Sequence, residues 1–161
     1  SQSERIYRFN GGAKMKISVI HGANLNLLGE RESSNYGSLT LTQIEKLLCR
    51  RFPEIIFDFF QSNIEGEIVE KIQSLRNGEG HLIINPGGYA HTSVVIRDAL
   101  ELFKNFKVEV HLSHLAKRED FRQQLITASA CDGYLSGFKE LGYYAAVELI
   151  KESLNKGITD D

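Results

Sequence analysis

One long polar segment of this chain carries side chains that could hold a small polar ligand and move a proton. Residues 21–37 follow a short apolar run and include Asn24, Arg31 and Tyr36 among several glycines. A tyrosine with an ordinary pKa of about 10 is a poor base at neutral pH, but a neighbouring guanidinium favours the phenolate. The segment therefore predicts an arginine-assisted tyrosine base. The alternative is a tyrosine that only packs.

A second candidate lies at residues 108–113, where apolar and polar residues alternate. The polar members, Glu109, His111 and Ser113, share one face of a strand, and polar groups in a covered sheet are costly unless they have partners. A carboxylate beside an imidazole orients the ring and favours its protonated form. His111 is therefore predicted to be a general acid, with a hydrogen-bonded histidine of the core as the alternative.

A third group of candidate residues lies at the end of the apolar run at 82–85. The segment at 85–93 contains Asn85, two glycines and His91, and it opens a helical pattern. Glycines let the backbone approach a ligand closely, and a helix N-terminus attracts anions. Thr92 or Ser93 could instead serve only as a helix cap.

Two arginines complete the set of candidates. Arg118 and Arg122 are four residues apart in a predicted short helix over about 118–125, so they would share one helical face. Either could clamp a carboxylate through paired hydrogen bonds, or both could simply be solvated.

Several familiar kinds of site are not expected. The chain has no G-x-G-x-x-G motif, phosphate-binding P-loop or G-x-S-x-G motif. His111 and His114 are three residues apart but have no third metal ligand at a suitable spacing, so we expect no metal site. Lys107 begins its strand, at the wrong end for a Schiff-base nucleophile.

The composition is that of an ordinary globular protein. The chain has 161 residues, 42% of them hydrophobic and 25% charged, with a net charge of −2. A chain of this length buries roughly 68–70% of its unfolded surface, enough for one domain. The balanced charge gives no reason to expect a nucleic-acid partner, and no apolar run approaches the roughly 20 residues of a membrane span. Cys49 and Cys131 fit a reducing, cytoplasmic setting as buried small hydrophobes.

Apolar runs alternate with helical patterns along the chain, which predicts an α/β fold. The first helix should begin after Thr40, because Thr40 and Gln43 have the spacing of a capping box. The expected strands are 17–20, 55–60, 82–85, 108–112 and 133–136. The expected helical faces include Leu41, Ile44 and Leu48; Ile64, Ile68, Ile72 and Leu75; Val95, Ala99 and Leu102; and Leu141, Ala145 and Leu149.

Five such repeats predict an open five-stranded parallel sheet of flavodoxin-like order 2-1-3-4-5, with helices on both faces. Ligands bind beyond the carboxyl ends of such strands, and four of the five strands end near the polar candidates. We expect residues 15–155 to form this single domain. Residues 1–14 are expected to be a disordered tag or extension, and 156–161 a frayed tail.

The chain resembles the type II 3-dehydroquinate dehydratases (3-dehydroquinases) over nearly all of residues 15–154. The resemblance rests on several ordered motifs. They are Asn-Leu-Asn-Leu-Leu-Gly-x-Arg-Glu at 24–32 with Tyr36-Gly37, Gln-Ser-Asn-x-Glu-Gly at 61–66, residues 85–98, Glu-Val-His-Leu-Ser at 109–113, Arg118-Glu119 and Phe121-Arg122.

The resemblance implies dehydration of 3-dehydroquinate to 3-dehydroshikimate through an enolate, without cofactor or metal, as the third step of the shikimate pathway that leads to chorismate and the aromatic amino acids. By matching position, Tyr36 is the base, His111 the acid, Arg31 the group that activates Tyr36, and Asn24 the residue that holds a water at the enolate. The implied substrate-binding residues are Asn85, His91, Leu112, Ser113, Arg122 and, from a neighbouring subunit, Asp98. It also implies a homododecamer of four trimers.

The chain departs from the usual family pattern at four positions, Ala23, Ser33, Pro86 and His114. The family commonly has proline at the first two, so their loss could loosen the loop at 29–37. The competing interpretation is a non-catalytic small-molecule or signalling module on a flavodoxin-like fold. A phosphoacceptor domain would need acidic residues where this chain has Asn24 and Asn85. A flavin carrier would need a hydroxyl-rich phosphate loop after the first strand.

Overall fold

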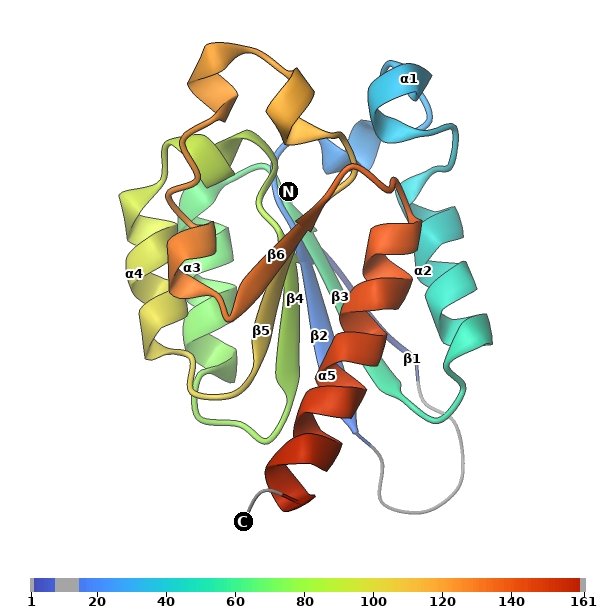
Figure 1. The fold of residues 1–161 in the computed structure, drawn as a ribbon, viewed down its shortest axis with the longest axis vertical. Helices are drawn as coiled ribbons and strands as arrows, with labels where there is room; N and C mark the ends of the chain where they lie inside the picture. Colours follow the sequence, from blue (N-terminus) through green and yellow to red (C-terminus); the bar gives the residue numbers. More distant parts are fainter. Residues whose placement is uncertain (1, 8–14, 160–161) are drawn as a thin grey trace.

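A single twisted sheet runs through the middle of the molecule (Figure 1). The computed structural model describes residues 2–7 and 15–159. The strand order is β1-β3-β2-β4-β5-β6, and every neighbouring pair except β1 and β3 is parallel. The five parallel strands therefore have the order 2-1-3-4-5, which confirms the predicted flavodoxin-like sheet. The strands are β1 (Gln2–Tyr7), β2 (Lys16–His21), β3 (Ile56–Ser62), β4 (His81–Asn85), β5 (Lys107–His111) and β6 (Gly133–Ser136).

Helices cover both faces of the sheet, α2 and α5 on one side and α3 and α4 on the other (Figure 1). The α-helices are α1 (Ser33–Tyr36), α2 (Leu41–Arg51), α3 (Glu65–Leu75), α4 (Val94–Leu102) and α5 (Leu141–Thr159). Short 3₁₀ turns lie at η1 (Leu25–Leu27), η2 (Gly87–His91), η3 (Leu115–Lys117), η4 (Asp120–Arg122) and η5 (Ala128–Ala130). No helix in the described ranges is both long and apolar enough to cross a bilayer.

The capping residues predicted for two helices are confirmed in part. Thr40 accepts a hydrogen bond from the Gln43 backbone while the Gln43 side chain accepts one from Thr40, so α2 begins with the predicted capping box. For α4 the cap is Ser93, whose hydroxyl accepts from the Ile96 backbone at 3.0 Å. Of the two residues considered there, Thr92 does not cap the helix.

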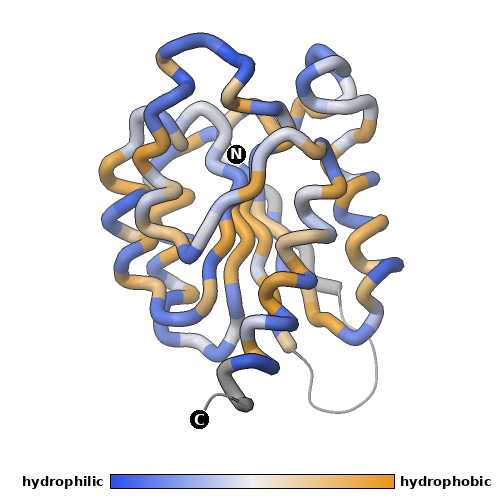
Figure 2. The backbone as a smooth tube through the Cα atoms, in the orientation of Figure 1, coloured by the Kyte–Doolittle hydropathy of each residue, from blue (hydrophilic) through white to orange (hydrophobic). Residues whose placement is uncertain are grey.

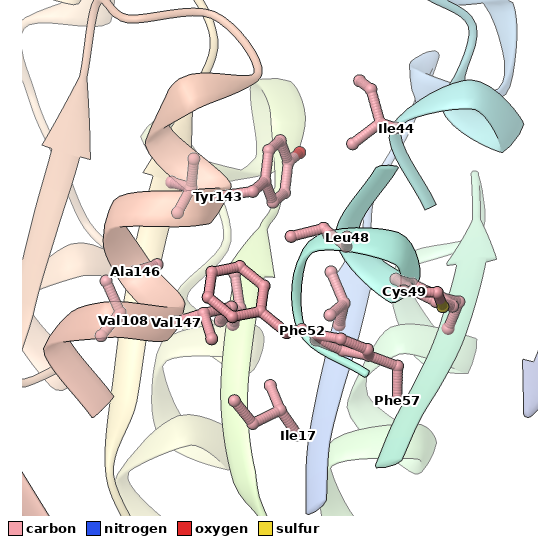
Figure 3. Close-up of a cluster of buried hydrophobic side chains, with 14 of the residues drawn as sticks. Ile17, Ile44, Leu48, Cys49, Phe52, Phe57, Val108, Tyr143, Ala146 and Val147 are labelled. Carbon is pink, nitrogen blue, oxygen red and sulfur yellow. The ribbon is translucent and has the colours of Figure 1, made fainter. Parts of the chain in front are cut away.

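The core has two layers because successive residues of a strand point to opposite faces. On one face Ile17 and Val19 pack with Leu48 of α2 and Val147 of α5 (Figure 3). On the other face Ile20 packs with side chains of α3 and α4. Both faces of the central strands β2 and β4 are covered, so the middle of these strands is apolar, as the hydropathy colouring of Figure 2 shows.

The apolar face predicted for α4 is wrong in part, and the face predicted for α5 is wrong throughout, because Leu141, Ala145 and Leu149 are all exposed. Val95 and Leu102 are exposed in α4, and the residues that reach the core are Ile96, Ala99 and Leu100. In α5 the exposed residues include Leu141 and Leu149, whereas Tyr143, Ala146, Val147 and Ile150 are buried. Both helices carry apolar residues on two faces, so periodicity alone could not identify the face that packs on the sheet.

The segment before residue 15, expected to be disordered, contributes β1, which pairs antiparallel with β3. The strand covers an edge of the sheet that would otherwise leave backbone groups without ladder partners. Glu4 of β1 also pairs with Lys71 of α3 at 2.7 Å, and Lys71 contacts the buried Asp58 at 3.0 Å. Residues 8–14 and 160–161 lie outside the described residues. The expected tail at 156–161 begins within α5, which continues to Thr159.

Candidate active site

All but one of the predicted site residues line a single pocket at the carboxyl ends of the parallel strands. They come from the last residues of β4 and β5 and from the segments that follow β2, β4 and β5. These residues are Asn24, Arg31, Tyr36, Asn85, His91, His111, Leu112, Ser113 and Arg122, and the pocket is completed by neighbours that include Gly87, Gly88 and Arg118. The loops above the sheet in Figure 1 carry most of them. The topology therefore brings together residues that are up to 98 positions apart in the sequence, from Asn24 to Arg122.

Two glycines let the loops after β2 and β4 interlock at the base of the pocket. A Cβ on Gly22 would lie 2.1 Å from the Pro86 carbonyl oxygen, and one on Gly87 would lie 2.8 Å from the Ala23 carbonyl oxygen. Both contacts are too short for any larger residue, and Gly87 also has a positive φ of 65°. Asn24 itself adopts a left-handed backbone with φ of 70°, which asparagine tolerates better than most residues. The backbone N–H of Asn24 donates to Asn63 Oδ1 at 3.0 Å.

His111 is held from below by a buried carboxylate. Its Nε2 donates to Glu109 Oε2 at 2.7 Å, and Thr127 Oγ1 donates to Glu109 Oε1 at 2.5 Å. Glu109 and Thr127 are fully buried and His111 is nearly so. This arrangement directs Nε2 to the carboxylate and leaves Nδ1 as the ring nitrogen available to a ligand.

His91 stands beside His111, with 6.2 Å between the ring centroids. Its Nδ1 donates to the Gln124 carbonyl at 2.9 Å, so Nε2 is the nitrogen that can accept a hydrogen bond. Burial lowers the pKa of His91, and the nearby His111 and Arg122 act in the same direction, although the hydrogen bond to Gln124 opposes them. The two histidines therefore present different nitrogens to the pocket, Nδ1 in His111 and Nε2 in His91.

Asn85 ends β4 and is anchored at both ends of its amide. The Gly87 backbone donates to Oδ1 at 3.1 Å, and Nδ2 donates to the hydroxyl of Tyr143 at 3.0 Å. Together with His111, Glu109 and Thr127, Asn85 forms a buried set that we call the pocket floor.

Tyr36 lies on the opposite side of the pocket, at the end of the short helix α1. We call residues 29–37 the lid. The Arg31 guanidinium lies over the Tyr36 ring, 3.8 Å from its centroid, while Arg118 donates to the Tyr36 hydroxyl at 2.6 Å and to Ser113 Oγ at 3.2 Å. Two guanidinium groups thus contact one phenol. Arg118 links the lid to the end of β5.

The short helix predicted over 118–125 is wrong. The backbone of Arg118 is extended, with φ of −99° and ψ of −173°, so it separates η3 from η4. The Gln123 side chain donates to backbone carbonyls of this segment, including that of Leu115 at 2.7 Å, and thereby replaces the hydrogen bonds of a regular helix. Arg118 and Arg122 still reach the same pocket, but the extended backbone lets Arg118 turn toward Tyr36.

Asp98 is the one predicted site residue that does not line the pocket. It lies on α4 with its side chain 62% exposed and 3.9 Å from Arg97. Its implied role in the site of a neighbouring subunit stays a prediction.

Sequence reasoning missed two residues that support the site and underrated a third. Thr127 and Tyr143 carry no local signal, because their partners are 18 and 58 residues away. Arg118 was considered only as a solvated residue or a carboxylate clamp, and its contact with Tyr36 spans 82 residues, so the sequence held no local signal for it. Across the described ranges, no three His, Cys, Asp or Glu side chains are grouped as a metal ion would require.

The sequence matches the family described as Dehydroquinase class II over residues 15–151. The chain belongs to the class II dehydroquinase family. Among similar proteins, a 3-dehydroquinate dehydratase from Aliarcobacter butzleri is 44% identical over 144 residues, which are 88% of each chain. One from Thermotoga petrophila is 43% identical over 144 residues, covering 88% of this chain and 99% of its own.

The solved structures agree with the assignment to class II dehydroquinases. A crystal structure of type II dehydroquinase from Butyrivibrio crossotus superposes with a TM-score of 0.83 at 39% identity, covering 87% of this chain and 99% of that one. The region that matches the dehydroquinase family starts at residue 15, so β1 lies outside it. The pocket lies entirely inside it.

Proposed function

We propose that this protein is a type II 3-dehydroquinate dehydratase, a hydro-lyase that converts 3-dehydroquinate to 3-dehydroshikimate and water in the shikimate pathway. One observation carries the proposal: Tyr36, contacted by two guanidinium groups, and His111, paired with a buried carboxylate, line the same pocket. Elimination of water from a hydroxy ketone needs one base and one acid of this kind.

In the proposed first step, the Tyr36 phenolate removes a proton from C2 of the substrate, and the electron pair of that bond forms an enolate with the neighbouring ketone. Arg118 stabilises the phenolate by its hydrogen bond to the hydroxyl oxygen, and Arg31 does so from above the ring. A water held near Asn24 would stabilise the enolate oxygen.

In the second step, the enolate collapses, the bond between C1 and its hydroxyl breaks, and His111 supplies the proton that turns the departing hydroxyl into water. Glu109 keeps the imidazole oriented, with Thr127 holding Glu109 in turn. The protons balance, because the base has gained one and the acid has lost one. No step requires oxidation, reduction or an organic cofactor.

The remaining pocket residues are suited to a polyhydroxylated carboxylate. Asn85, His91, Ser113 and the backbone at Leu112 offer hydrogen bonds to hydroxyl or carboxylate oxygens, and Arg122 offers a charged fork. Positioned acid and base groups each contribute about 10²–10⁴-fold to the rate. We expect the rest of the rate enhancement to come from fixed dipoles around the enolate and from a lid that excludes water.

The test is an absorbance assay with 3-dehydroquinate, in which the conjugated enone of the product raises ultraviolet absorbance. We expect Tyr36→Phe to reduce kcat by about 10²–10⁴-fold. Tyr134→Phe is the matched control, because Tyr134 is an exposed tyrosine on β6 outside this pocket. A wild-type protein that gives no absorbance change would contradict the proposal and favour a non-catalytic binding module. Near-normal turnover by Tyr36→Phe would remove Tyr36 as the base.

The proposal extends to assembly and location. We propose a homododecamer of four trimers in which Asp98 enters a neighbouring subunit's pocket. In support, Asp98 shares α4 with the exposed apolar side chains Val94, Val95 and Leu102, which would be covered in such an assembly. Sedimentation analysis would test the stoichiometry. A cytoplasmic location agrees with the two free cysteines, and fractionation of the source cells would test it.

A further inference from the structure

A chain of three buried polar side chains extends from the pocket into the core. Asn85 and His21 are directly opposite each other on the neighbouring strands β4 and β2, so their side chains lie on the same face of the sheet. Tyr143, in the first turn of α5, reaches this face from above. Figure 3 shows its side chain reaching from α5 toward α2, with the hydroxyl oxygen at its far end. His21 and Tyr143 are fully buried and Asn85 is 3% exposed.

The hydrogen bonds determine how each of these groups is oriented. Because the Gly87 N–H donates to Asn85 Oδ1 at 3.1 Å, the other end of the amide must be Nδ2. Nδ2 donates to the Tyr143 oxygen at 3.0 Å, which leaves the hydroxyl hydrogen for His21 Nε2, also at 3.0 Å. His21 therefore accepts on Nε2 and carries its hydrogen on Nδ1.

Burial keeps both ring side chains neutral. It lowers the pKa of His21 to about 3 and raises the pKa of Tyr143 above its ordinary value. A neutral imidazole is required if Nε2 is to accept from Tyr143. The chain of hydrogen bonds from His21 through Tyr143 to Asn85 therefore keeps one direction throughout the ordinary range of pH.

This arrangement costs folding free energy that apolar residues would not cost. His21 Nδ1 is buried and has no hydrogen-bond partner among residues 2–7 and 15–159, and an unsatisfied buried polar group is destabilising. A leucine at 21 and a phenylalanine at 143 could fill the same space without that cost. The polar pair is thus not explained by packing, and it reaches the pocket through the hydrogen bond between Tyr143 and Asn85.

We propose that Tyr143 and His21 are positioning residues that hold the Asn85 amide in the orientation that offers an N–H to the ligand. Tyr143 takes one of the two Nδ2 hydrogens, and the second is left for an acceptor oxygen, a hydroxyl or a carboxylate, in the pocket that Asn85 lines. Rotation of the amide by half a turn would present an oxygen instead and repel such a group. This inference rests on the proposed function, because the ligand it concerns is 3-dehydroquinate.

A double-mutant cycle tests the inference. We expect Tyr143→Phe to reduce kcat/KM about 10-fold and Asn85→Ala about 100-fold, since one hydrogen bond to a ligand is worth factors of this order. If Tyr143 acts through Asn85, the double variant should be no worse than Asn85→Ala within about 2-fold, because coupled residues are not additive. The matched control is Tyr144→Phe, which changes the next tyrosine of α5, a residue that packs on Phe52 instead of the pocket.

Additive losses in the double variant would overturn the inference, because a purely structural effect of Tyr143 would act equally with or without the Asn85 amide. Undiminished kcat/KM in Tyr143→Phe would also overturn it. If that variant does not fold, His21→Leu enters the same cycle, since it removes the acceptor of the Tyr143 hydroxyl while filling the space. A 3-fold or greater loss that vanishes in the Asn85→Ala background is then expected.

Crystal structures of the two tyrosine variants give a readout that does not depend on catalysis. We expect the Asn85 side chain to leave its orientation in Tyr143→Phe and to keep it in Tyr144→Phe. An unmoved Asn85 would overturn the inference even in an active enzyme. A wild-type protein without dehydratase activity would overturn the proposed function instead, so the two failures are distinguishable.

Discussion

The floor and the lid of the pocket are held in place by different forces. On the floor, His111 and Asn85 emerge from strand ends and are fixed by buried hydrogen bonds to Glu109 and Tyr143. In the lid, Tyr36 ends a four-residue helix that contains no buried residue, and its main partners are two arginines. The proposed acid, His111, is therefore positioned by the folded core itself, whereas the proposed base, Tyr36, is positioned by cationic contacts near the surface.

The largest effect should come from removing the acid. We expect His111→Ala to lower kcat about 10³-fold and to destabilise the fold by about 3–5 kcal/mol, because the buried Glu109 would lose its imidazole partner and keep only Thr127. Tyr36→Phe should lower kcat similarly and leave the melting temperature almost unchanged. Steady-state kinetics and thermal unfolding measure both quantities. Equal melting temperatures for the two variants would show that floor and lid do not differ in this way.

Within the lid, the two arginines should contribute unequally. Arg118→Met should reduce kcat about 10²-fold, because a charge-assisted hydrogen bond to the Tyr36 oxygen is lost. Arg31→Met should reduce it only about 10-fold, since a cation over a ring interacts more weakly. Methionine keeps most of the side-chain length in both variants. The reverse order of the two kcat values would assign the activation of Tyr36 to Arg31, as the sequence resemblance implies.

The free energy of unfolding should also depend on pH through His21, which lies behind Asn85 of the pocket floor. Its pKa is lowered from 6.5 to about 3 by burial, so the unfolded chain binds a proton that the folded chain excludes. The contribution of neutral His21 to the free energy of unfolding is therefore fully present above pH 6.5. It is lost as the pH falls toward 3, by about 1.4 kcal/mol per pH unit. Denaturant unfolding at pH 7 and pH 5 should show a smaller loss for His21→Leu than for the wild type. Equal losses would mean that His21 does not control this dependence.

The smallest expected effect concerns the order of the lid. Ser33 is the first residue of α1, where proline is well tolerated, and Glu32 before it has φ of −53° and ψ of 114°, a conformation that suits a residue preceding proline. Ser33→Pro should therefore restrict the open lid and lower KM about 2–5-fold. An unchanged KM, measured in the same absorbance assay, would indicate that lid order does not limit substrate binding.

Much of the fold followed from local pattern. Apolar runs such as 17–20 and 82–85 predicted buried parallel strands, and five repeats predicted the order of the parallel sheet, which the structure confirms. The rule that ligands bind beyond strand carboxyl ends then selected Asn24, Asn85 and His111 correctly as neighbours. These inferences succeeded because they depend on short apolar runs that alternate with helical patterns, and both are properties of short stretches of sequence.

Predictions of other features failed because those features depend on contacts between residues that are distant in the sequence. The packed face of α4 could not be chosen while Val95 and Ile96 looked equally apolar. The strand β1 forms only because β3 offers it an edge. The break at Arg118 needs the hydrogen bonds of the Gln123 side chain, which no propensity describes.

The sequence by itself determined the parallel sheet, the edge at which a ligand binds and the types of side chain gathered at that edge. It could do so because apolar runs and helical patterns are local properties of the chain. Only the tertiary structure decided how those groups are oriented: Thr127 behind Glu109, Tyr143 behind Asn85, and Arg118 against Tyr36. A hydrogen bond across 18, 58 or 82 residues is a property of packed elements. It arises only once burial has removed water as the competing partner.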